Sequence, residues 1–182
     1  MKLTLETERL ILRPFQIEDA EDMFYGWTSD IEVAKYVAWN PHESIEVTKA
    51  LLKQWLLEYE KPERLNFAIV KKEDNKLIGG IDVVSYNDGK PVIGYNLSRK
   101  YWNKGYMTEA CKCLINYLNS QGYNEILIDA LERNAASNRV IQKCGGEFIK
   151  SEDAFLSLKN QNAVINRYVV SFSNRSPNGE NP

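Results

Sequence analysis

Length, composition and charge are those of an ordinary folded protein. The chain has 182 residues, 43% apolar and 26% charged, which excludes a protein that is disordered throughout. Its 23 basic and 25 acidic residues leave a net charge of −2, so we expect no direct nucleic-acid partner. Its apolar runs are far shorter than the ~20 residues of a membrane span, and its N-terminus lacks the apolar segment of a signal peptide. We therefore expect a cytoplasmic protein with no membrane partner.

The cysteines and the histidine limit the chemistry. Cys111, Cys113 and Cys144 cannot all pair within one chain and lack metal-ligand spacing, so we interpret them as reduced structural thiols and expect no metal site. His42 is the only histidine. It follows an Asn-Pro turn signal and precedes a candidate helix N-cap at Ser44, which favours a loop or capping role over a catalytic one.

The first third of the chain predicts one strand and three helices. Residues 9–15 (RLILRPF) form an apolar strand that Pro14 stops, and residues 16–27 follow with acidic residues in the first turn, as a helix start prefers. A short helix is predicted over 30–37. Residues 44–59 repeat apolar side chains about every 3.6 positions, which indicates an amphipathic helix.

The middle of the chain changes to the period of strands. Residues 66–72, 76–86 and 92–98 predict three antiparallel strands in series. Polar turns over 73–75 and 87–89 join them.

A strand-helix-strand crossover follows. Helical spacing returns over 105–120, and Gly122 ends that helix. Residues 125–131 (EILIDAL) are continuous enough to form a strand buried on both faces.

The last part predicts a helix, a hairpin and a tail. Residues 134–144 form a short helix, and 147–158 and 163–172 form two strands joined by a polar turn. Residues 173–182 have almost no apolar content and predict a disordered tail. We therefore expect a single domain over residues 1–172.

Residues 102–110 (WNKGYMTEA) place a lone glycine at the start of a helix, where several backbone N–H groups have no partner and point one way. Gly105 lets a ligand approach the backbone closely, Thr108 adds a hydroxyl, and Lys104 adds a positive charge. This arrangement suits an anion, especially a pyrophosphate. The alternative is that Gly105 only turns the chain while Thr108 caps the helix. No GxGxxG or GxxxxGK[ST] motif occurs, which argues against a nucleotide-binding module.

Two longer runs, YWNKGYMTEA and ERNAASNRVIQKCGGEF, resemble the GCN5-related N-acetyltransferase family, in particular the branch of the ribosomal-protein alanine N-acetyltransferases. The opening ETERLILRPFQIEDAEDMF and the strand GGIDV resemble the same branch, so the resemblance covers about residues 8–172. It implies an α+β fold in which a mostly antiparallel sheet of about seven strands, the fourth and fifth of them splayed, is flanked by about four helices.

The resemblance also implies a reaction. An amine acceptor would attack the acetyl group of acetyl-CoA directly in a ternary complex. The acceptor would be a protein N-terminal amine, ribosomal proteins included, or a small-molecule amine, and a homodimer is left open.

The resemblance assigns the cofactor to a set of residues. The matching loop would bind the pyrophosphate of acetyl-CoA through backbone amides, and a strand edge would pair with the pantetheine arm, an N–H at that edge polarising the thioester carbonyl. Asn134 matches an asparagine that bonds the arm, and Arg139 matches a basic position that can reach it; the alternatives are an N-cap and a solvated charge. The loop residues are Asn103, Lys104, Gly105, Tyr106, Met107 and Thr108, and the strand-edge residues are Tyr95, Asn96 and Leu97.

The family's loop pattern is only partly present. The usual pattern is Gln or Arg, two residues, Gly, one residue, then Gly or Ala, whereas this chain has Trp102 and Met107 at the first and last of these positions. A backbone-mediated contact survives such side-chain changes provided that the loop geometry is kept.

Acid and base are less clearly marked. The family's usual acid is a tyrosine, and this chain has Ile141 at that position. In the ribosomal-protein branch a serine takes the role, and the matching residue here is Ser137. Ser137 would hydrogen-bond to the sulfur, and the alternative is that it only satisfies backbone groups at the helix N-terminus. Candidate bases are Asp82, Asp129 and Glu109. Glu109 is explained by its place in a first helical turn, whereas burial in an apolar strand would raise the pKa of Asp82. A water chain is the alternative base.

Acceptor binding is expected in the first two helices, their loop and the final hairpin. Candidate acceptor-binding residues are Trp27, Tyr36, Trp39 and His42. The rival hypothesis is a noncatalytic acyl-CoA-binding or sensing domain, which Met107 and Ile141 favour.

Overall fold

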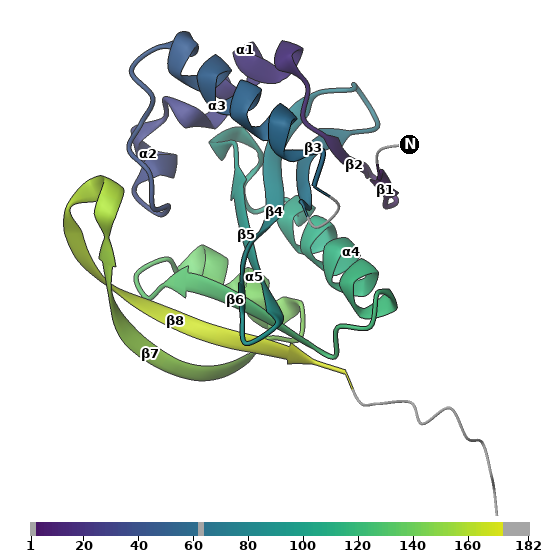
Figure 1. Ribbon diagram of the computed structural model, residues 1–182, viewed down its shortest axis with the longest axis vertical. Coiled ribbons are helices and arrows are strands. Elements are labelled where there is room, and N and C mark those ends of the chain that lie inside the picture. The colour runs from purple at the N-terminus through teal and green to yellow at the C-terminus, as the bar shows by residue number, and fades with distance from the viewer. Residues whose placement is uncertain (1–2, 62–63, 173–182) are drawn as a thin grey trace, which may run out of the picture.

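The computed structural model describes residues 3–61 and 64–172 (Figure 1). Its eight described strands form one sheet in the order β1-β2-β3-β4-β5-β6-β8-β7, and only β5 and β6 run parallel to each other. The predicted α+β fold is confirmed. Strand β1 was not predicted, because its two residues are too few to show the alternating pattern of a strand. The predicted tail, 173–182, lies outside the described residues. The strands are β1 (Leu5–Glu6), β2 (Leu10–Pro14), β3 (Asn66–Lys71), β4 (Leu77–Asn87), β5 (Lys90–Leu97), β6 (Glu125–Leu131), β7 (Glu147–Leu156) and β8 (Gln161–Ser171).

The first predicted helix, over residues 16–27, is instead a series of short turns. A 3-10 turn (Ile17–Asp19), the one-turn helix α1 and a π turn (Phe24–Thr28) follow one another. Thr28 Oγ1 donates to the Met23 carbonyl at 3.2 Å and Ser29 Oγ to the Phe24 carbonyl at 2.6 Å, so hydroxyls compete for helix acceptors where the π turn forms. The α-helices are α1 (Ala20–Met23), α2 (Ile31–Ala34), α3 (Ile45–Glu58), α4 (Tyr106–Ser120) and α5 (Ala135–Lys143).

Each face of the sheet has its own core. Successive residues of β3 point to opposite faces, so Phe67 and Ile69 join one core and Ala68 and Val70 the other. Helices α4 and α5 cover the first face, and α1 and α3 cover the second (Figure 1). Trp27 is 1% exposed in the second core, and burial of such a side chain contributes about 2–3 kcal/mol. The sheet is therefore held between two layers of helices.

Helix α4 begins and ends at glycines. Its apolar side chains recur every three or four residues and are buried against the sheet, among them Cys111, Leu114 and Leu118. At its end Gly122 has φ +95°, and Tyr123 N–H donates to the Leu118 carbonyl at 3.2 Å, which is a Schellman cap. The predicted helix end at Gly122 is thereby confirmed.

Strands β5 and β6 separate soon after they meet. Their register joins only Val92 to Leu127 and Ile93 to Ile128, although β5 continues to Leu97 and β6 to Leu131. Beyond Ile93, the edge of β5 that faces β6 has no strand partner in the described sheet. The predicted splay is confirmed.

The β7–β8 hairpin is long and curved, and its tip reaches toward α2 (Figure 1). Asn40 Nδ2 donates to the Leu158 carbonyl at 2.6 Å. The ammonium group of Lys159 donates to the Ala34 carbonyl. These contacts hold the hairpin tip against α2 and the loop that follows it.

Candidate active site

The start of α4 presents backbone N–H groups. Gly105 is the N-cap with φ +81° and Asn103 has φ +59°, so both residues adopt left-handed backbone. The first intrahelical bond runs from Glu109 N–H to the Gly105 carbonyl at 3.1 Å. In the part of the chain that the structure describes, the N-cap residue makes no side-chain hydrogen bond to this helix start. Orphan amides gathered at a positive helix end can bind an anion.

A salt bridge fixes this helix start to the first strands. The Glu109 carboxylate accepts hydrogen bonds from Thr7 Oγ1 at 2.5 Å and from Arg9 N–H at 2.9 Å, and pairs with the Arg9 guanidinium at 2.6 Å. Partial burial raises the pKa of Glu109, but these hydrogen bonds outweigh it and hold the pKa below its ordinary value. Arg9 also lies 4.5 Å from the Tyr106 ring centroid. Glu109 therefore positions the loop, as the sequence favoured.

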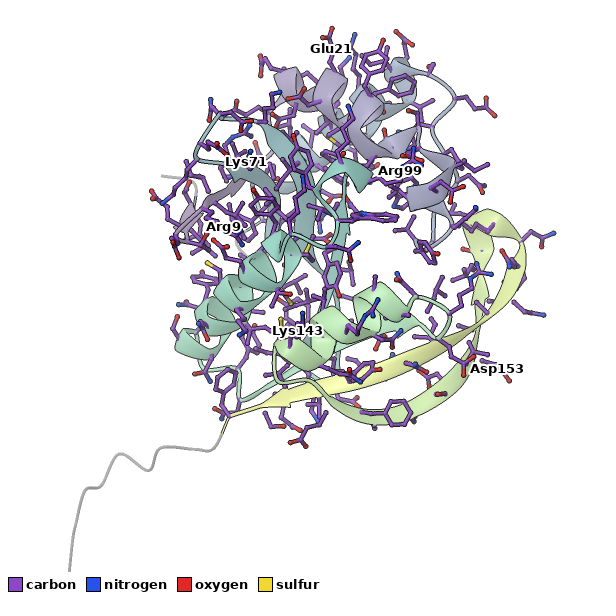
Figure 2. All side chains as sticks on the ribbon, turned by 180° about the vertical axis from the view of Figure 1, so that it is seen from behind. Arg9, Glu21, Lys71, Arg99, Lys143 and Asp153 are labelled. Atoms are coloured by element: carbon purple, nitrogen blue, oxygen red, sulfur yellow. The ribbon has the colours of Figure 1, made fainter. Side chains whose placement is uncertain are left out.

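An open groove of about 380 Å³ lies along the same helix start. Two lysines from different helices, Lys112 on α4 and Lys143 on α5, contribute to it, and Figure 2 labels Lys143 and Arg9 on either side of α4. No sequence pattern marked this pair, because only the packing of α5 beside α4 brings the two lysines together. The groove is lined by Glu8, Gly105, Thr108, Glu109, Lys112 and Lys143.

The end of β5 offers one amide to the gap between the splayed strands. Ser98 N–H donates to the Ile78 carbonyl at 2.8 Å, so the residue before it, Leu97, turns its backbone groups away from β4. The Leu97 carbonyl accepts Trp102 Nε1–H at 2.8 Å on that side. The Leu97 N–H is therefore directed toward the gap, where a carbonyl oxygen could accept its hydrogen bond.

A tyrosine and a serine meet across this gap. Tyr95 Oη lies 2.8 Å from Ser137 Oγ and 3.3 Å from the Ser137 carbonyl. Burial raises the pKa of Tyr95 well above its ordinary value, so its hydroxyl stays protonated. Ser137 N–H donates to Asn134 Oδ1 at 3.1 Å, which makes Asn134 the N-cap of α5 and leaves its amide nitrogen for another acceptor. Sequence reasoning assigned only the backbone of Tyr95 and missed its side chain.

Two of the positions that depart from the family pattern are buried. Ile141, at the position of the usual acid, is 0% exposed, and Met107 is 6% exposed in the same core. Arg139 is exposed on α5. The chain thus uses Ile141 and Met107 for packing, while the backbone amide of Met107 still lies in the first turn of α4.

The candidate bases separate in the structure. Asp129 accepts two hydrogen bonds from Arg167, at 2.8 and 3.0 Å, which is a structural ion pair. Asp82 lies opposite Gly94 on the face of α1 and α3, away from Tyr95 and Ser137. Burial raises the pKa of Asp82 to about 7, although Arg64 at 3.8 Å lowers it. The charge of Asp82 can therefore change near neutral pH.

The four candidate acceptor residues fall into two groups. Trp27 is buried in the second core, so its ring packs inside the protein and is not available to an acceptor. Tyr36 packs edge-on against Trp102, with 6.4 Å between ring centroids, and Trp39 lies 5.8 Å from His42. These three side chains are partly exposed on the segment that follows α2.

His42 belongs to a chain of buried hydroxyls. Its Nδ1 lies 2.7 Å from Thr48 Oγ1, which lies 3.0 Å from Thr28 Oγ1. Partial burial lowers the pKa of His42, so the ring is neutral at pH 7. These contacts agree with the predicted loop role.

The family model of the acetyltransferase (GNAT) domain matches residues 9–147. The chain belongs to the GNAT family. It is 33% identical, over 71% of this chain and 71% of the relative, to an uncharacterized N-acetyltransferase, p20, of Bacillus licheniformis. A GNAT-family acetyltransferase from Bacillus anthracis has a TM-score of 0.80 at 24% identity, covering 93% of this chain and 98% of that one. RimL, a ribosomal L7/L12 alpha-N-protein acetyltransferase solved with coenzyme A, has a TM-score of 0.81 at 16% identity, covering 93% and 98%.

The GNAT domain and these relatives make the protein an N-acetyltransferase that uses acetyl-CoA. The described residues fit this cofactor. Orphan amides at the start of α4 and two lysines of the groove beside it suit its phosphates, and the unpaired edge of β5 suits its amide-containing arm. Within residues 3–61 and 64–172, no helix has both the length and the apolar character that crossing a bilayer requires.

Proposed function

We propose that this acetyltransferase acts on the amino group of a protein N-terminus, which attacks the thioester directly while both substrates are bound. The observation that carries the proposal is the pairing of Tyr95 and Ser137 across the gap that receives the Leu97 amide. The Leu97 N–H can stabilise an oxyanion, and the Ser137 hydroxyl can assist a leaving thiolate. Both are needed when a neutral amine attacks the thioester directly.

The cofactor-binding residues follow the start of α4 and the edge of β5. The backbone amides of 103–108 hold the pyrophosphate, and Lys104, Lys112 and Lys143 add positive charge near it. The backbone of residues 95–97 pairs with the arm of the cofactor, as an added strand would. Asn134 bonds the arm through its amide nitrogen, and exposed Arg139 reaches it from α5.

Each reacting group has one protein partner. Acetyl-CoA supplies the thioester carbonyl and the leaving sulfur. The Leu97 N–H donates to the carbonyl oxygen as negative charge develops there. Ser137 Oγ–H donates to the sulfur, and Tyr95, which stays protonated, donates to Ser137 Oγ and so leaves the serine hydrogen free to do this.

The acceptor is proposed to enter between the α2 region and the hairpin tip. Tyr36, Trp39 and His42 lie on that side, and the contact of Asn40 with Leu158 forms one boundary of this entrance. The similarity to RimL, an alpha-N-protein acetyltransferase, favours a protein N-terminus, ribosomal proteins included, over a small amine. A cytoplasmic location, supported by three free cysteines, and a homodimer complete the proposal.

The experiment measures acetyl-CoA binding by calorimetry and thiol release with a panel of acceptors. The panel holds Ala- and Ser-starting peptides, the same peptides with acetylated N-termini and an internal lysine, and small amines. We expect thiol release with free N-termini only. Release with small amines or lysine alone would contradict the N-terminal acceptor, and binding without release from any acceptor would favour a noncatalytic acyl-CoA-binding domain.

A further inference from the structure

Three polar side chains share one face of three neighbouring strands. The register sets Asn66 opposite Asp82 and Asp82 opposite Gly94, while one row further along the sheet Gly80 lies opposite Asn96. Residues directly opposite each other point to the same face, and so do alternate residues of one strand. Asn66, Asp82 and Asn96 therefore form one cluster, which we call the amide-carboxylate cluster, on the face covered by α1 and α3.

Two members of this cluster have unpartnered polar atoms. Asn66 is 3% exposed, yet its Nδ2 has no hydrogen-bond partner among the described residues. Asn96 Oδ1 is also buried without a partner in that part of the chain. A buried polar atom without a hydrogen bond costs about 1–3 kcal/mol. The unpartnered oxygen of Asn96 therefore points to a ligand that donates a hydrogen bond to it.

The cluster has a defined charge. Asp82 is the carboxylate, and Arg64, 3.8 Å from it, is shared with Glu58 of α3 at 3.0 Å. Tyr59 of α3 faces the same region and stays neutral, because burial raises the pKa of Tyr59 to about 12. Asp19, from the turn before α1, is engaged in its own bidentate pair with Arg13. The side chain of Asp82 is 22% exposed, so the cluster is open to the surface.

The two oxygen acceptors suit an amino group. Diagonal neighbours on adjacent strands have Cα atoms about 7–8 Å apart, and one nitrogen with hydrogen bonds of about 2.9 Å to both side chains spans that separation. Asn96 precedes Leu97, whose N–H is directed toward the thioester carbonyl in the proposed function. An amine held at Asn96 therefore lies beside the carbon it must attack.

We propose that Asn96 Oδ1 and the Asp82 carboxylate accept hydrogen bonds from the amino group of the acceptor. This inference rests on the proposed function. It makes Asn96 and Asp82 catalytic residues. Because the opposite face carries Tyr95 and Ser137, the acceptor and the leaving thiol are served from opposite faces of the sheet.

The protons balance along this route. The acceptor arrives as an ammonium ion and gives one proton to the Asp82 carboxylate, which returns it to solvent. The neutral nitrogen then forms the new C–N bond as the C–S bond breaks. The second proton lost by nitrogen ends on the sulfur of coenzyme A.

The first experiment follows the side-chain NH₂ signals of Asn66 and Asn96 by NMR while a Ser-starting peptide is added to the full chain with coenzyme A. We expect both signals to shift, and no shift with the same peptide acetylated at its N-terminus. Acetylation of the same peptide in a parallel assay with acetyl-CoA, without these shifts in the coenzyme A complex, would overturn the amide-carboxylate cluster and leave the proposed function intact. Shifts without acetylation would support the cluster and overturn the proposed function.

The second experiment measures thiol release against pH. Asn96→Ala is expected to raise the peptide KM at least tenfold with an unchanged Kd for acetyl-CoA, and Asn96→Asp, which keeps an acceptor oxygen, to restore KM. Asp82→Asn is expected to remove the rise in rate with a midpoint near pH 7, because an ionised carboxylate is the base.

Asp129→Asn is the matched control. Its carboxylate is equally exposed, at 22%, but pairs with Arg167 on β8. We expect this variant to keep the pH midpoint of the wild type. Loss of the midpoint in Asp129→Asn, or its survival in Asp82→Asn, would overturn the assignment, and circular dichroism confirms that each variant is folded.

Discussion

Replacement of Gly105 by alanine tests the anion site at the start of α4. Gly105 has φ +81°, and an added Cβ would meet only Arg9 Nη2 at 3.5 Å, an ordinary contact. The loss of stability therefore comes from the left-handed backbone, which costs about 1–2 kcal/mol for a residue with a Cβ. Part of this is offset because alanine reduces the conformational entropy of the unfolded chain. We expect a net loss of about 1 kcal/mol, a fall in Tm of about 2–4 °C for a chain of this size.

The effect on the cofactor should be larger than this strain. If the backbone of Gly105 shifts, at least one amide at the start of α4 leaves the pyrophosphate, and a hydrogen bond to a charged group is worth about 1.5–3 kcal/mol. The acetyl-CoA Kd should therefore rise at least about tenfold. Thermal denaturation and titration calorimetry measure the two effects separately.

Gly122→Ala is the control for this experiment. Gly122 has φ +95°, nothing lies within 4 Å of its added Cβ, and it stands at the other end of the same helix. It should lose similar stability with an unchanged Kd. If Gly105→Ala also keeps the wild-type Kd while its Tm falls, the reasoning that places the diphosphate on the α4 amides is wrong.

Three further predictions concern the site and its support. Ser137→Ala should lower kcat about tenfold with an unchanged acetyl-CoA Kd, since its hydroxyl serves the leaving sulfur; unaltered turnover would remove it from the mechanism. Asn134→Ala should weaken acetyl-CoA binding and lower stability by about 1 kcal/mol through loss of the α5 cap, whereas Asn134→Ser should recover stability alone, as denaturation and calorimetry would show. The pKa of Glu109 is lowered in the folded protein, so its ionised carboxylate stabilises the fold at pH values above the ordinary pKa of a glutamate. This stabilisation is lost as the pH falls through the folded-state pKa. Glu109→Gln should thus be less stable than wild type by about 1 kcal/mol at pH 7, allowing for solvent screening of exposed Arg9, with a difference that vanishes in acid; a difference independent of pH would contradict this.

Local patterns in the sequence were enough for most of the elements and for the family. Apolar periodicity separated strands from helices because burial of one face imposes a period of two or 3.6 residues. Gly105 and Gly122 marked the ends of α4 because left-handed backbone strongly favours residues without a Cβ. The π turn after Met23 was not predictable in this way, because it forms where hydroxyls of Thr28 and Ser29 reach carbonyls five residues back.

Contacts between distant segments were decided by the tertiary structure alone. The Tyr95 hydroxyl meets Ser137 only because β5 and β6 diverge and α5 packs over the gap. The register of three strands sets Asn66 and Asn96 on the face of Asp82, and a shift of one residue would send any of them to the other face. Local sequence determines which faces a segment can present, whereas the partners across those faces are chosen by the packing of the whole chain.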